Sequence, residues 1–234
     1  AGQRLRRGAR GPGGGGGAGE NGEGVVLVLV DLQAEFFAEE GVMRRRALDP
    51  DVAERAVDHA RRVLRGGGTV VLVKSCYDRW ATSPAPLRQV EPADNTVPPK
   101  PDRLAGAHRG GGCCARTSPL SALLPAAATL LEEGWGPRVS VVEKEWFSAF
   151  IDTSLLSLCA SARVLQLAGV TSTTCVAATA WDAARLSLPV EVLSDVTAAG
   201  AAAAHARGLS LLRGLPAPSP LVRASCELRG WAGR

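Results

Sequence analysis

The stretch "DPDVAERAVDHARRVLRGGGTVVLVKS", residues 49–75, decides the fold because it joins an amphipathic helix directly to a buried strand. We expect Asp49 and Pro50 to begin the helix as its N-cap and first residue, and the glycines at 66–68 to end it. Aliphatic residues recur between these ends at helical spacing: Val52, Ala56, Ala60, Val63 and Leu64. The β-branched run that follows at 69–75 predicts a strand.

A second apolar run, "VVLVLV" at residues 25–30, precedes this helix and is typical of a strand that is buried on both faces of a parallel sheet. The two strands and the helix between them predict one right-handed βαβ unit. Further strand-like runs at 138–144, 163–170 and 189–196 alternate with helical segments, and residues 221–228 form a candidate edge strand. The sequence therefore predicts an α/β fold. We expect a single Rossmann-like three-layer domain whose sheet has about six mostly parallel strands, with helices on both faces.

Length and composition fit one folded domain preceded by a tail. The 234 residues include 46% hydrophobic and 21% charged residues, which are ordinary values for a globular protein. Residues 1–23 are rich in Gly and Arg and have almost no large apolar side chain, so we expect a disordered tail that fits a targeting remnant. Residues 24–234 are then the folded domain, in which the Pro- and Gly-rich segment 78–118 predicts a long loop.

The sequence pattern argues against several classes of partner. No apolar run approaches the ~18 residues of a membrane-spanning helix, so we expect no membrane partner. Basic residues gather in the tail and no basic patch with interleaved aromatic residues remains elsewhere, so we expect no nucleic acid. The six cysteines form no CxxC pair and are too sparse for a disulfide scaffold. They predict a reducing compartment, either the cytoplasm or an organelle.

Three polar residues follow strands of the predicted sheet. Asp31 comes after the first strand, Lys144 ends the third, and Cys175 follows the fourth at the start of a predicted helix. The carboxyl ends of parallel strands lie at one edge of a sheet, so we expect the three side chains to converge in one crevice. A lone buried cysteine is more often a packing residue than a nucleophile. A cysteine beside a base and an ammonium has the composition of a nucleophilic site.

The chemistry of this set predicts nucleophilic catalysis. The thiolate is the reactive form of cysteine, and we expect the helix N-terminus and the Lys144 ammonium to lower the pKa of Cys175. Asp31 is placed to accept the thiol proton and to return it to a leaving amine. Backbone N–H groups at the start of the helix, including that of Cys175, are oriented to hold a developing oxyanion.

Three segments resemble the isochorismatase-like cysteine hydrolases. "VVLVLVDLQAEFF" at 25–37 is similar to the opening strand of that family and its D-x-Q-x-x-F-F motif. "VEKEWFSAFIDTSLLSLC" at 142–159 resembles the segment that carries the family's lysine. "LAGVTSTTCVAATAWDAARLSLPVEVLSDV" at 167–196 resembles its nucleophile block. These blocks occur in the family's order, and the resemblance spans residues 25–213.

The resemblance implies roles for individual residues. Asp31 is then the base, Lys144 stabilises the thiolate and the transition state, and Cys175 is the nucleophile. It also implies a cis peptide bond between Val170 and Thr171, which directs the Thr171 N–H toward the oxyanion. The expected activity is the hydrolysis of a small-molecule amide through a covalent acyl-enzyme, without a cofactor. The resemblance further implies a homo-oligomer.

Two alternatives stay open at this point. One is the hydrolysis of a vinyl ether such as isochorismate, which in the family can proceed without the cysteine, and the other is a catalytically silent binding or scaffold protein. The segment "CCARTSPLSALLP" at 113–125 resembles a further family block only weakly, with Arg and Pro where Gly is usual, so the substrate pocket is unassigned. Phe37, Trp146 and Phe150 flank the three reactive residues and are candidates for lining that pocket.

A metal site is not expected. Nicotinamidases of this superfamily carry a zinc-binding Asp and two His after the second strand, whereas the segment "VKSCYDRWATSP" at 73–84 has Asp78 and no His. The three histidines of the chain, His59, His108 and His205, lie elsewhere in the sequence. Imidazole is the usual ligand for borderline metals, so we expect no metal and no other cofactor.

Overall fold

The computed structural model describes residues 23–41, 49, 51–77, 114–215 and 220–228. The predicted tail, apart from Glu23, and residues 78–113 of the predicted loop, which include Asp78 and His108, lie outside the described residues. No helix in the described part of the chain is long and apolar enough to cross a membrane.

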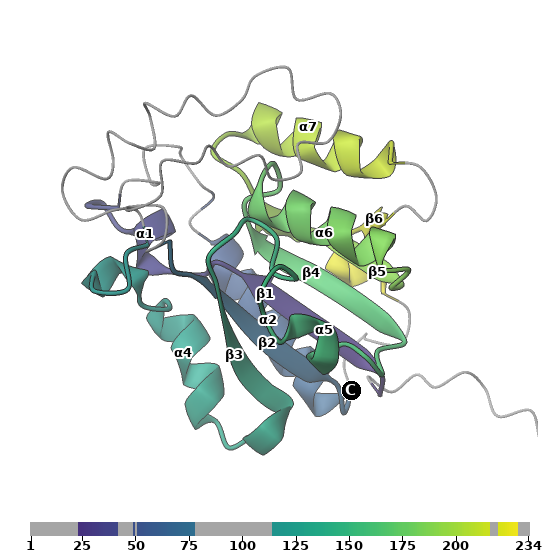
Figure 1. Ribbon diagram of the computed structural model, residues 1–234, viewed down its shortest axis with the longest axis horizontal. Coiled ribbons are helices and arrows are strands. Elements are labelled where there is room, and N and C mark those ends of the chain that lie inside the picture. Colours follow the sequence, from purple (N-terminus) through teal and green to yellow (C-terminus); the bar gives the residue numbers. More distant parts are fainter. Residues whose placement is uncertain (1–22, 42–48, 50, 78–113, 216–219, 229–234) are drawn as a thin grey trace, which may run out of the picture.

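A single parallel sheet forms the centre of the described structure (Figure 1). Its order is β3-β2-β1-β4-β5-β6, and every neighbouring pair is parallel. The strands are β1 (Val25–Val30), β2 (Thr69–Ser75), β3 (Val139–Lys144), β4 (Val164–Val170), β5 (Val190–Ala198) and β6 (Leu221–Arg223). This arrangement confirms the predicted α/β fold, and the candidate edge strand near the C-terminus is the short β6.

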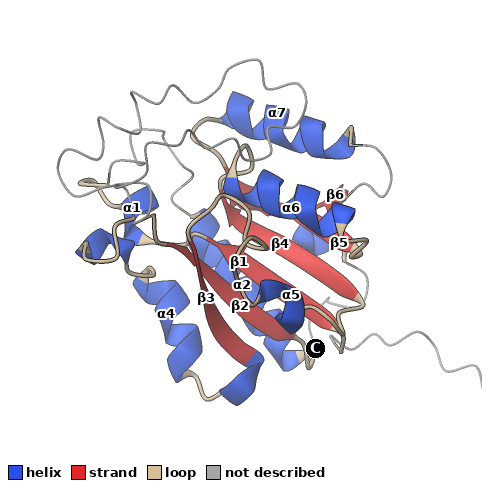
Figure 2. Ribbon diagram, viewed as in Figure 1, coloured by secondary structure: helices blue, strands red, loops and turns tan. Residues whose placement is uncertain are grey.

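Helices cover both faces of the sheet (Figure 2). They are α1 (Ala34–Phe37), α2 (Val52–Arg65), α4 (Pro125–Glu132), α5 (Leu155–Leu158), α6 (Cys175–Arg185) and α7 (Ala202–Arg213), with 3-10 turns η4 (Pro119–Ser121), η5 (Gly136–Arg138) and η6 (Ser225–Glu227). Helices α2 and α4 pack on one face, and α5, α6 and α7 pack on the other. The result is the predicted three-layer arrangement.

Strand β1 shows why its sequence is apolar at every position. Val26, Val28 and Val30 pack toward α6, whereas Leu27 and Leu29 pack toward α2. Successive side chains of a strand point to opposite faces, so a strand covered on both faces needs no polar alternation. The same two clusters fix the position of the strand's carboxyl end, where the reactive residues lie.

The start of α2 differs from the prediction. We expected Asp49 to be the N-cap, but the helix begins at Val52 and Asp51 is the N-cap residue. The Asp49 carboxylate instead accepts the backbone N–H of Asp51 at 3.0 Å. Asp and Asn side chains commonly accept a backbone N–H two residues on, which produces a turn rather than a helix cap. The helix is therefore shorter at its N-terminus than the sequence predicts.

The direction of the chain connections reverses between β1 and β4. Chain connections run from β1 toward β2 and β3 on one side and from β4 toward β5 and β6 on the other. In open α/β sheets this reversal point opens a crevice beyond the carboxyl ends of the strands, where ligands bind. Asp31 directly follows β1, and Cys175 follows β4 by a short turn.

Candidate active site

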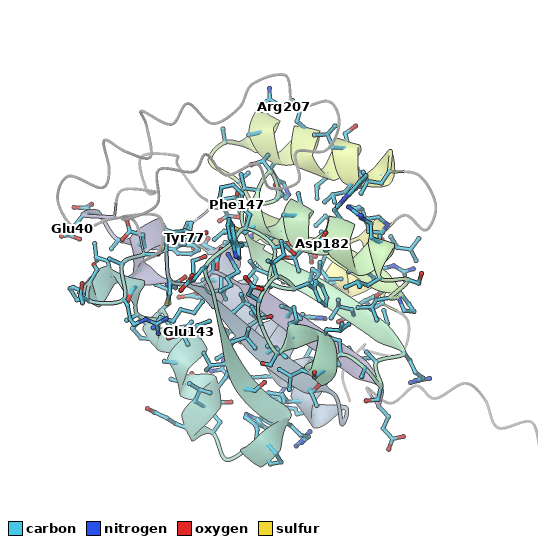
Figure 3. The ribbon with its side chains drawn as sticks, viewed as in Figure 1. Glu40, Tyr77, Glu143, Phe147, Asp182 and Arg207 are labelled. Carbon is cyan, nitrogen blue, oxygen red and sulfur yellow. The ribbon has the colours of Figure 1, made fainter. Side chains whose placement is uncertain are left out.

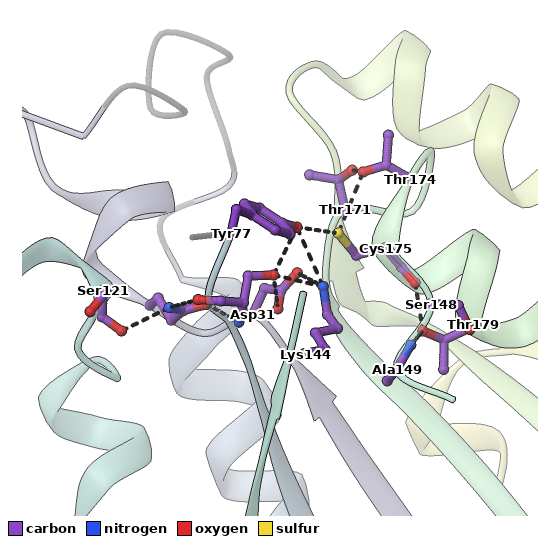
Figure 4. Close-up of polar contacts among 12 residues, drawn as sticks. Asp31, Tyr77, Ser121, Lys144, Ser148, Ala149, Thr171, Thr174, Cys175 and Thr179 are labelled. Carbon is purple, nitrogen blue, oxygen red and sulfur yellow. Dashed lines mark hydrogen bonds and ion pairs between the residues drawn. The ribbon is translucent and has the colours of Figure 1, made fainter. Parts of the chain in front are cut away.

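Four strand ends bring the reactive residues together (Figure 4). Asp31 follows β1, Ser75 ends β2, Lys144 ends β3, and Cys175 begins α6 after β4. Asp31, Lys144 and Cys175 are 0%, 1% and 3% exposed, so all three are withdrawn from bulk water. The Lys144 ammonium forms an ion pair with Asp31, with 3.0 Å between Nζ and Oδ2. The structure thus brings together the three residues that the sequence predicts.

Local backbone geometry turns Asp31 out of the strand. Its φ of 55° lies in the left-handed region, which a non-glycine residue adopts seldom and Asp more readily than most. Its N–H still donates to the Val73 carbonyl at 2.9 Å, so the residue stays attached to the sheet edge. Residues held in this region cluster at functional sites, where the surrounding structure fixes them.

A polar network links the ion pair to Ser75 at the end of β2 and to Tyr77 just after it. The Lys144 ammonium lies 2.6 Å from Ser75 Oγ and 3.4 Å from the Tyr77 hydroxyl. The Ser75 hydroxyl lies 2.9 Å from Asp31 Oδ1 and 2.8 Å from the Tyr77 oxygen. The Tyr77 oxygen is in turn 3.6 Å from Cys175 Sγ. Every member of this group is buried.

Hydrogen bonds within the turn before Cys175, and a contact from α7, hold this turn in place. The peptide bond between Val170 and Thr171 is cis, as the family resemblance implies. The Thr171 carbonyl accepts the N–H of Val176, which ties the turn to the first residues of α6. The Thr171 and Thr174 hydroxyls are 2.5 Å apart, and Thr174 Oγ1 is 4.0 Å from Cys175 Sγ.

Helix α7 braces the same turn through His205. Its Nε2 lies 3.1 Å from the Ser194 carbonyl, which can only accept, so Nε2 carries the proton. Its Nδ1 then accepts the Ser172 hydroxyl at 3.0 Å. A Cβ at Gly208 would lie 2.6 Å from the Ser172 carbonyl oxygen, so the close approach of α7 depends on a glycine at this position.

Comparison with known proteins agrees with this architecture. A family model described as the isochorismatase domain matches residues 25–219. The chain belongs to the isochorismatase family. The match places it among the isochorismatase-family hydrolases. A search of curated proteins finds no match.

Three solved structures illustrate the shared isochorismatase-family fold. The nicotinamidase PncA from Bacillus subtilis is 20% identical, with a TM-score of 0.62 over 85% of this chain and 98% of the other. An isochorismatase family protein from Desulfovibrio vulgaris is also 20% identical, with a TM-score of 0.66 over 87% and 95%. A cysteine hydrolase from Pseudomonas syringae is 17% identical, with a TM-score of 0.66 over 90% and 93%. At this identity the likeness shows the fold alone.

The charge state of this isochorismatase-family site differs from the sequence-based expectation. Burial, followed by the Asp31 carboxylate, raises the pKa of Cys175 from an ordinary value of 9.0 to about 12. Lys144 and Tyr77 act in the opposite direction but do not outweigh these two causes. Our expectation of a lowered thiol pKa is therefore wrong for the resting site. At neutral pH the structure favours a thiol beside a carboxylate rather than a preformed thiolate.

Lys144 keeps its charge in this environment. Burial opposes an ammonium, but the Asp31 carboxylate and the Cys175 side chain together raise the pKa of Lys144 above its ordinary value. Tyr77 also keeps its proton, because burial, followed by Cys175, Asp31 and Cys114, raises the pKa of its phenol well above the ordinary value. The site therefore holds a permanent cation and a permanent neutral donor at neutral pH.

The three aromatic residues that the sequence suggests as pocket lining have different surroundings. Phe37 and Phe150 pack against the hydrophobic core clusters, and the Trp146 indole N–H donates to Asp152 at 3.3 Å. Their role as pocket lining stays a prediction. Figure 3 labels Phe147 and Tyr77, whose rings meet edge to face with 6.5 Å between their centroids.

Sequence reasoning missed Ser75, Tyr77 and Cys114. Ser75 could have been found, because it ends a strand at the same sheet edge as Asp31 and Lys144. Tyr77 lies two residues further on, where no motif marks it. Cys114 lies in a turn within the predicted loop 78–118, where it is fully buried and packs with Tyr77 and Val170.

The described residues offer no metal site. No group of three or more His, Cys, Asp or Glu side chains within the described ranges is placed to hold a metal ion. His59 lies on α2 bonded to Gln166, at 2.9 Å, and His205 is engaged with the turn before α6. Asp78 and His108 lie outside the described residues.

Proposed function

We propose that this isochorismatase-family chain is a cysteine-dependent hydrolase that cleaves the C–N bond of a small-molecule amide. The observation that carries the proposal is the position of Cys175 at the first residue of α6, beside the buried Asp31–Lys144 ion pair. A thiol at a helix start with a carboxylate base and a fixed cation has the parts that nucleophilic acyl transfer requires.

The first half of the reaction forms the acyl-enzyme. Asp31 accepts the thiol proton, and the resulting Cys175 thiolate attacks the carbonyl carbon of the amide. The carbonyl oxygen becomes an oxyanion, and the N–H groups of Thr171 and Cys175 are the proposed donors that hold it. The tetrahedral intermediate then collapses, and the C–N bond breaks. Asp31 returns the proton to the leaving nitrogen, so ammonia or an amine departs and a thioester on Cys175 remains.

The second half of the reaction restores the enzyme. Asp31 accepts a proton from water while the water oxygen attacks the thioester carbonyl carbon, and the C–S bond breaks to release a carboxylic acid. The proton on Asp31 then returns to Sγ. Lys144 stays protonated throughout and offsets the negative charge that moves among Asp31, Sγ and the oxyanion.

A raised thiol pKa fits this order of events. With a pKa of about 12, Cys175 stays protonated until a base takes its proton during attack. The Asp31 carboxylate that helps to raise this pKa is also the group placed to receive the proton. The nicotinamidases and the cysteine hydrolase among the structural neighbours support an amide substrate at the level of analogy.

A panel of small amides, with ammonia or amine release as the readout, tests the proposal. We expect Cys175→Ala and Cys175→Ser to lose turnover of any amide that the unmodified protein hydrolyses, and mass spectrometry to find the acyl group on Cys175. Cys226→Ser is the matched control, because Cys226 is exposed and lies near the C-terminus, on η6. Retention of amide turnover by Cys175→Ala contradicts the thiolate mechanism.

Isochorismate belongs in the same panel. Hydrolysis of this vinyl ether that persists in Cys175→Ala, with no amide turned over by the unmodified protein, would favour the other chemistry of the family. Absence of turnover and of any adduct on Cys175 across the panel would favour a binding or scaffold role. Either result contradicts amide hydrolysis as the function.

A further inference from the structure

Tyr77 is the only tyrosine of the chain, and the three-residue set of Asp31, Lys144 and Cys175 does not include it. It is 7% exposed and lies just beyond the end of β2. Its hydroxyl contacts three polar groups of the site: Cys175 Sγ at 3.6 Å, Ser75 Oγ at 2.8 Å and Lys144 Nζ at 3.4 Å. A buried phenol in contact with the reacting sulfur calls for an account of where its hydrogen points.

The donors and acceptors of the network decide this direction. An ammonium only donates, so the three hydrogens of Lys144 are directed to Asp31, Ser75 and Tyr77. The Ser75 hydroxyl shares its hydrogen between Asp31 Oδ1 and the Tyr77 oxygen. The Tyr77 oxygen therefore accepts from both Lys144 and Ser75. Among the described residues, its own hydrogen has Cys175 Sγ as the acceptor within reach.

The strength of this acceptor changes during the reaction. While Cys175 is a thiol, its sulfur accepts the Tyr77 hydrogen only weakly. Once Asp31 has taken the thiol proton, Sγ carries a full negative charge and becomes the stronger acceptor. We propose that the Tyr77 hydroxyl donates to Cys175 Sγ at this stage and stabilises the thiolate that attacks the substrate. This inference rests on the proposed function and adds a fourth residue in contact with the reacting sulfur.

The ring of Tyr77 is held so that the hydroxyl keeps its direction. The Phe147 ring meets it edge to face, with an angle of 89° between the planes. Lys144 Nζ lies 5.5 Å from the ring centroid, and the Tyr77 N–H donates to the Cys114 carbonyl at 3.3 Å. A donor that is positioned before the charge develops stabilises it without reorganisation.

Four titratable groups face the Tyr77 hydroxyl. They are Asp31 after β1, Lys144 on β3, Cys114 directly after residues 78–113, and Cys175 on α6. They keep Tyr77 protonated, since burial and then Cys175, Asp31 and Cys114 raise its pKa. The bond to Tyr77 acts on Cys175 in the opposite sense, because it lowers the thiol pKa against burial and the Asp31 carboxylate.

Replacing Tyr77 by Phe removes the hydroxyl and keeps the ring. Lys144 retains Asp31 and Ser75 as acceptors, and Ser75 retains Asp31, so no member of the network loses all its partners.

The readout is the rate of iodoacetamide alkylation at Cys175, located by peptide mass spectrometry at several pH values. This rate follows the thiolate fraction. We expect it to fall about tenfold at each pH below the thiol pKa, the usual size of a hydrogen bond to a charged group.

Two controls separate the hydroxyl from packing. Cys226 is exposed and reports the activity of the reagent in each sample. Phe147→Leu loses the edge-to-face contact but keeps the hydroxyl, so we expect a smaller change in alkylation than for Tyr77→Phe. Equal losses in the two variants would mean that Tyr77 acts only through packing, and would overturn the proposal.

A fluorinated tyrosine should change the alkylation rate of Cys175 in the opposite direction to Tyr77→Phe. Growth on 3-fluorotyrosine labels Tyr77 alone, because the chain has no other tyrosine. The fluorinated phenol is a stronger donor, so we expect alkylation of Cys175 to become faster while Tyr77→Phe makes it slower. An unchanged rate in both proteins, or a fall in both, contradicts donation from Tyr77 to the thiolate.

The alkylation assay needs no substrate, which separates this inference from the proposed function. Amide turnover that persists in Cys175→Ala would remove the proposed function and leave the alkylation result to be judged by itself. Conversely, Cys175→Ala could lose turnover while Tyr77→Phe leaves the alkylation rate of Cys175 unchanged. That pair of results would support the proposed function and contradict this inference. With a turned-over amide, we expect Tyr77→Phe to lower kcat about tenfold and to leave KM nearly unchanged.

Discussion

Cys175 lies between a carboxylate that raises its pKa and an ammonium that lowers it. The same carboxylate binds the ammonium, so the charges of Asp31 and Lys144 largely offset each other before substrate arrives. Burial then decides the balance in favour of the neutral thiol. Removing one partner of a buried ion pair leaves an uncompensated charge, which makes each substitution at this site a test of charge as well as of chemistry.

Asp31→Asn separates the two effects of the carboxylate. Asn has the same size and keeps one acceptor oxygen for Lys144, and the Ser75 hydroxyl can still donate to Tyr77, but Asn cannot serve as the base. Without the carboxylate the pKa of Cys175 falls, because Asp31 is one of the causes that raise it. We therefore expect faster alkylation of Cys175 by iodoacetamide at neutral pH together with a loss of amide turnover of about 100-fold or more.

For Asp31→Asn the decisive result is faster alkylation of Cys175 together with slower amide turnover. Peptide mapping at Cys175 and ammonia release are measured on the same protein, and circular dichroism verifies that it is folded. Slower alkylation would show that Asp31 does not hold the thiol in its neutral form. Undiminished turnover would show that Asp31 is not the base.

The sequence predicted some of these residues and not others, for physical reasons. Asp31, Lys144 and Cys175 follow apolar strands, and the carboxyl ends of parallel strands must meet, so their convergence could be derived. Tyr77 could not be placed, because its position depends on the chain path after β2. The direction of the Cys175 pKa shift depends on burial, which spacing alone does not reveal.

Strand β4 lies close against β1 at Gly169. This residue has a φ of +104° and lies opposite Val30, where the ladder between β4 and β5 is also irregular. A Cβ at Gly169 would lie 2.1 Å from the Val30 carbonyl oxygen. Backbone atoms of a central strand cannot move aside easily, so this glycine fixes the path of the chain toward the turn before Cys175.

Gly169→Ala is expected to destabilise the fold strongly. It combines a left-handed backbone with a backbone clash, and we expect a loss of about 3 kcal/mol or more in the free energy of unfolding, measured by urea titration. Gly134→Ala is the matched control, because Gly134 also has a positive φ, +77°, but nothing lies within 4 Å of its Cβ position. We expect about 1 kcal/mol there. Equal losses in the two variants would rule out the clash as the cause.

The strands were largely predictable, whereas the start of helix α2 was not. The runs at 25–30 and 69–75 became β1 and β2 with unchanged bounds, because continuous β-branched sequence has few other solutions. The N-cap of α2 is Asp51 rather than Asp49, because the Asp49 carboxylate binds the Asp51 N–H and forms a turn before the helix. Burial of β1 on both faces was predictable, whereas the close approach at Gly169 depends on the paired register.

Across the whole molecule, a chain of polar contacts joins α2 to the far edge of the sheet. His59 on α2 lies 2.9 Å from Gln166 on β4, and the Gln166 amide donates to Glu191 on β5 at 3.2 Å. Glu191 in turn pairs with Arg223 on β6, at 3.5 Å. These contacts connect the helix layer to the strands on one side of β1. A small-molecule substrate, a homo-oligomer and a reducing compartment stay predictions at this scale.

His59 makes the stability of the whole fold sensitive to acid. It is 1% exposed, and burial lowers its pKa from 6.5, although the bond to Gln166 opposes this shift. Below pH 6.5 the unfolded chain therefore binds a proton that the folded chain resists, so stability is full above pH 6.5 and falls as the pH drops toward the folded pKa.

His59→Gln tests this assignment, because an amide can still bond to Gln166 but does not titrate. We expect the fall in unfolding free energy between about pH 7.5 and pH 5.5 to be smaller in the variant by roughly 1 kcal/mol, the value of about one pKa unit. Urea titrations at the two pH values measure it. If His59→Gln loses as much stability in acid as the unmodified protein, the acid sensitivity arises elsewhere.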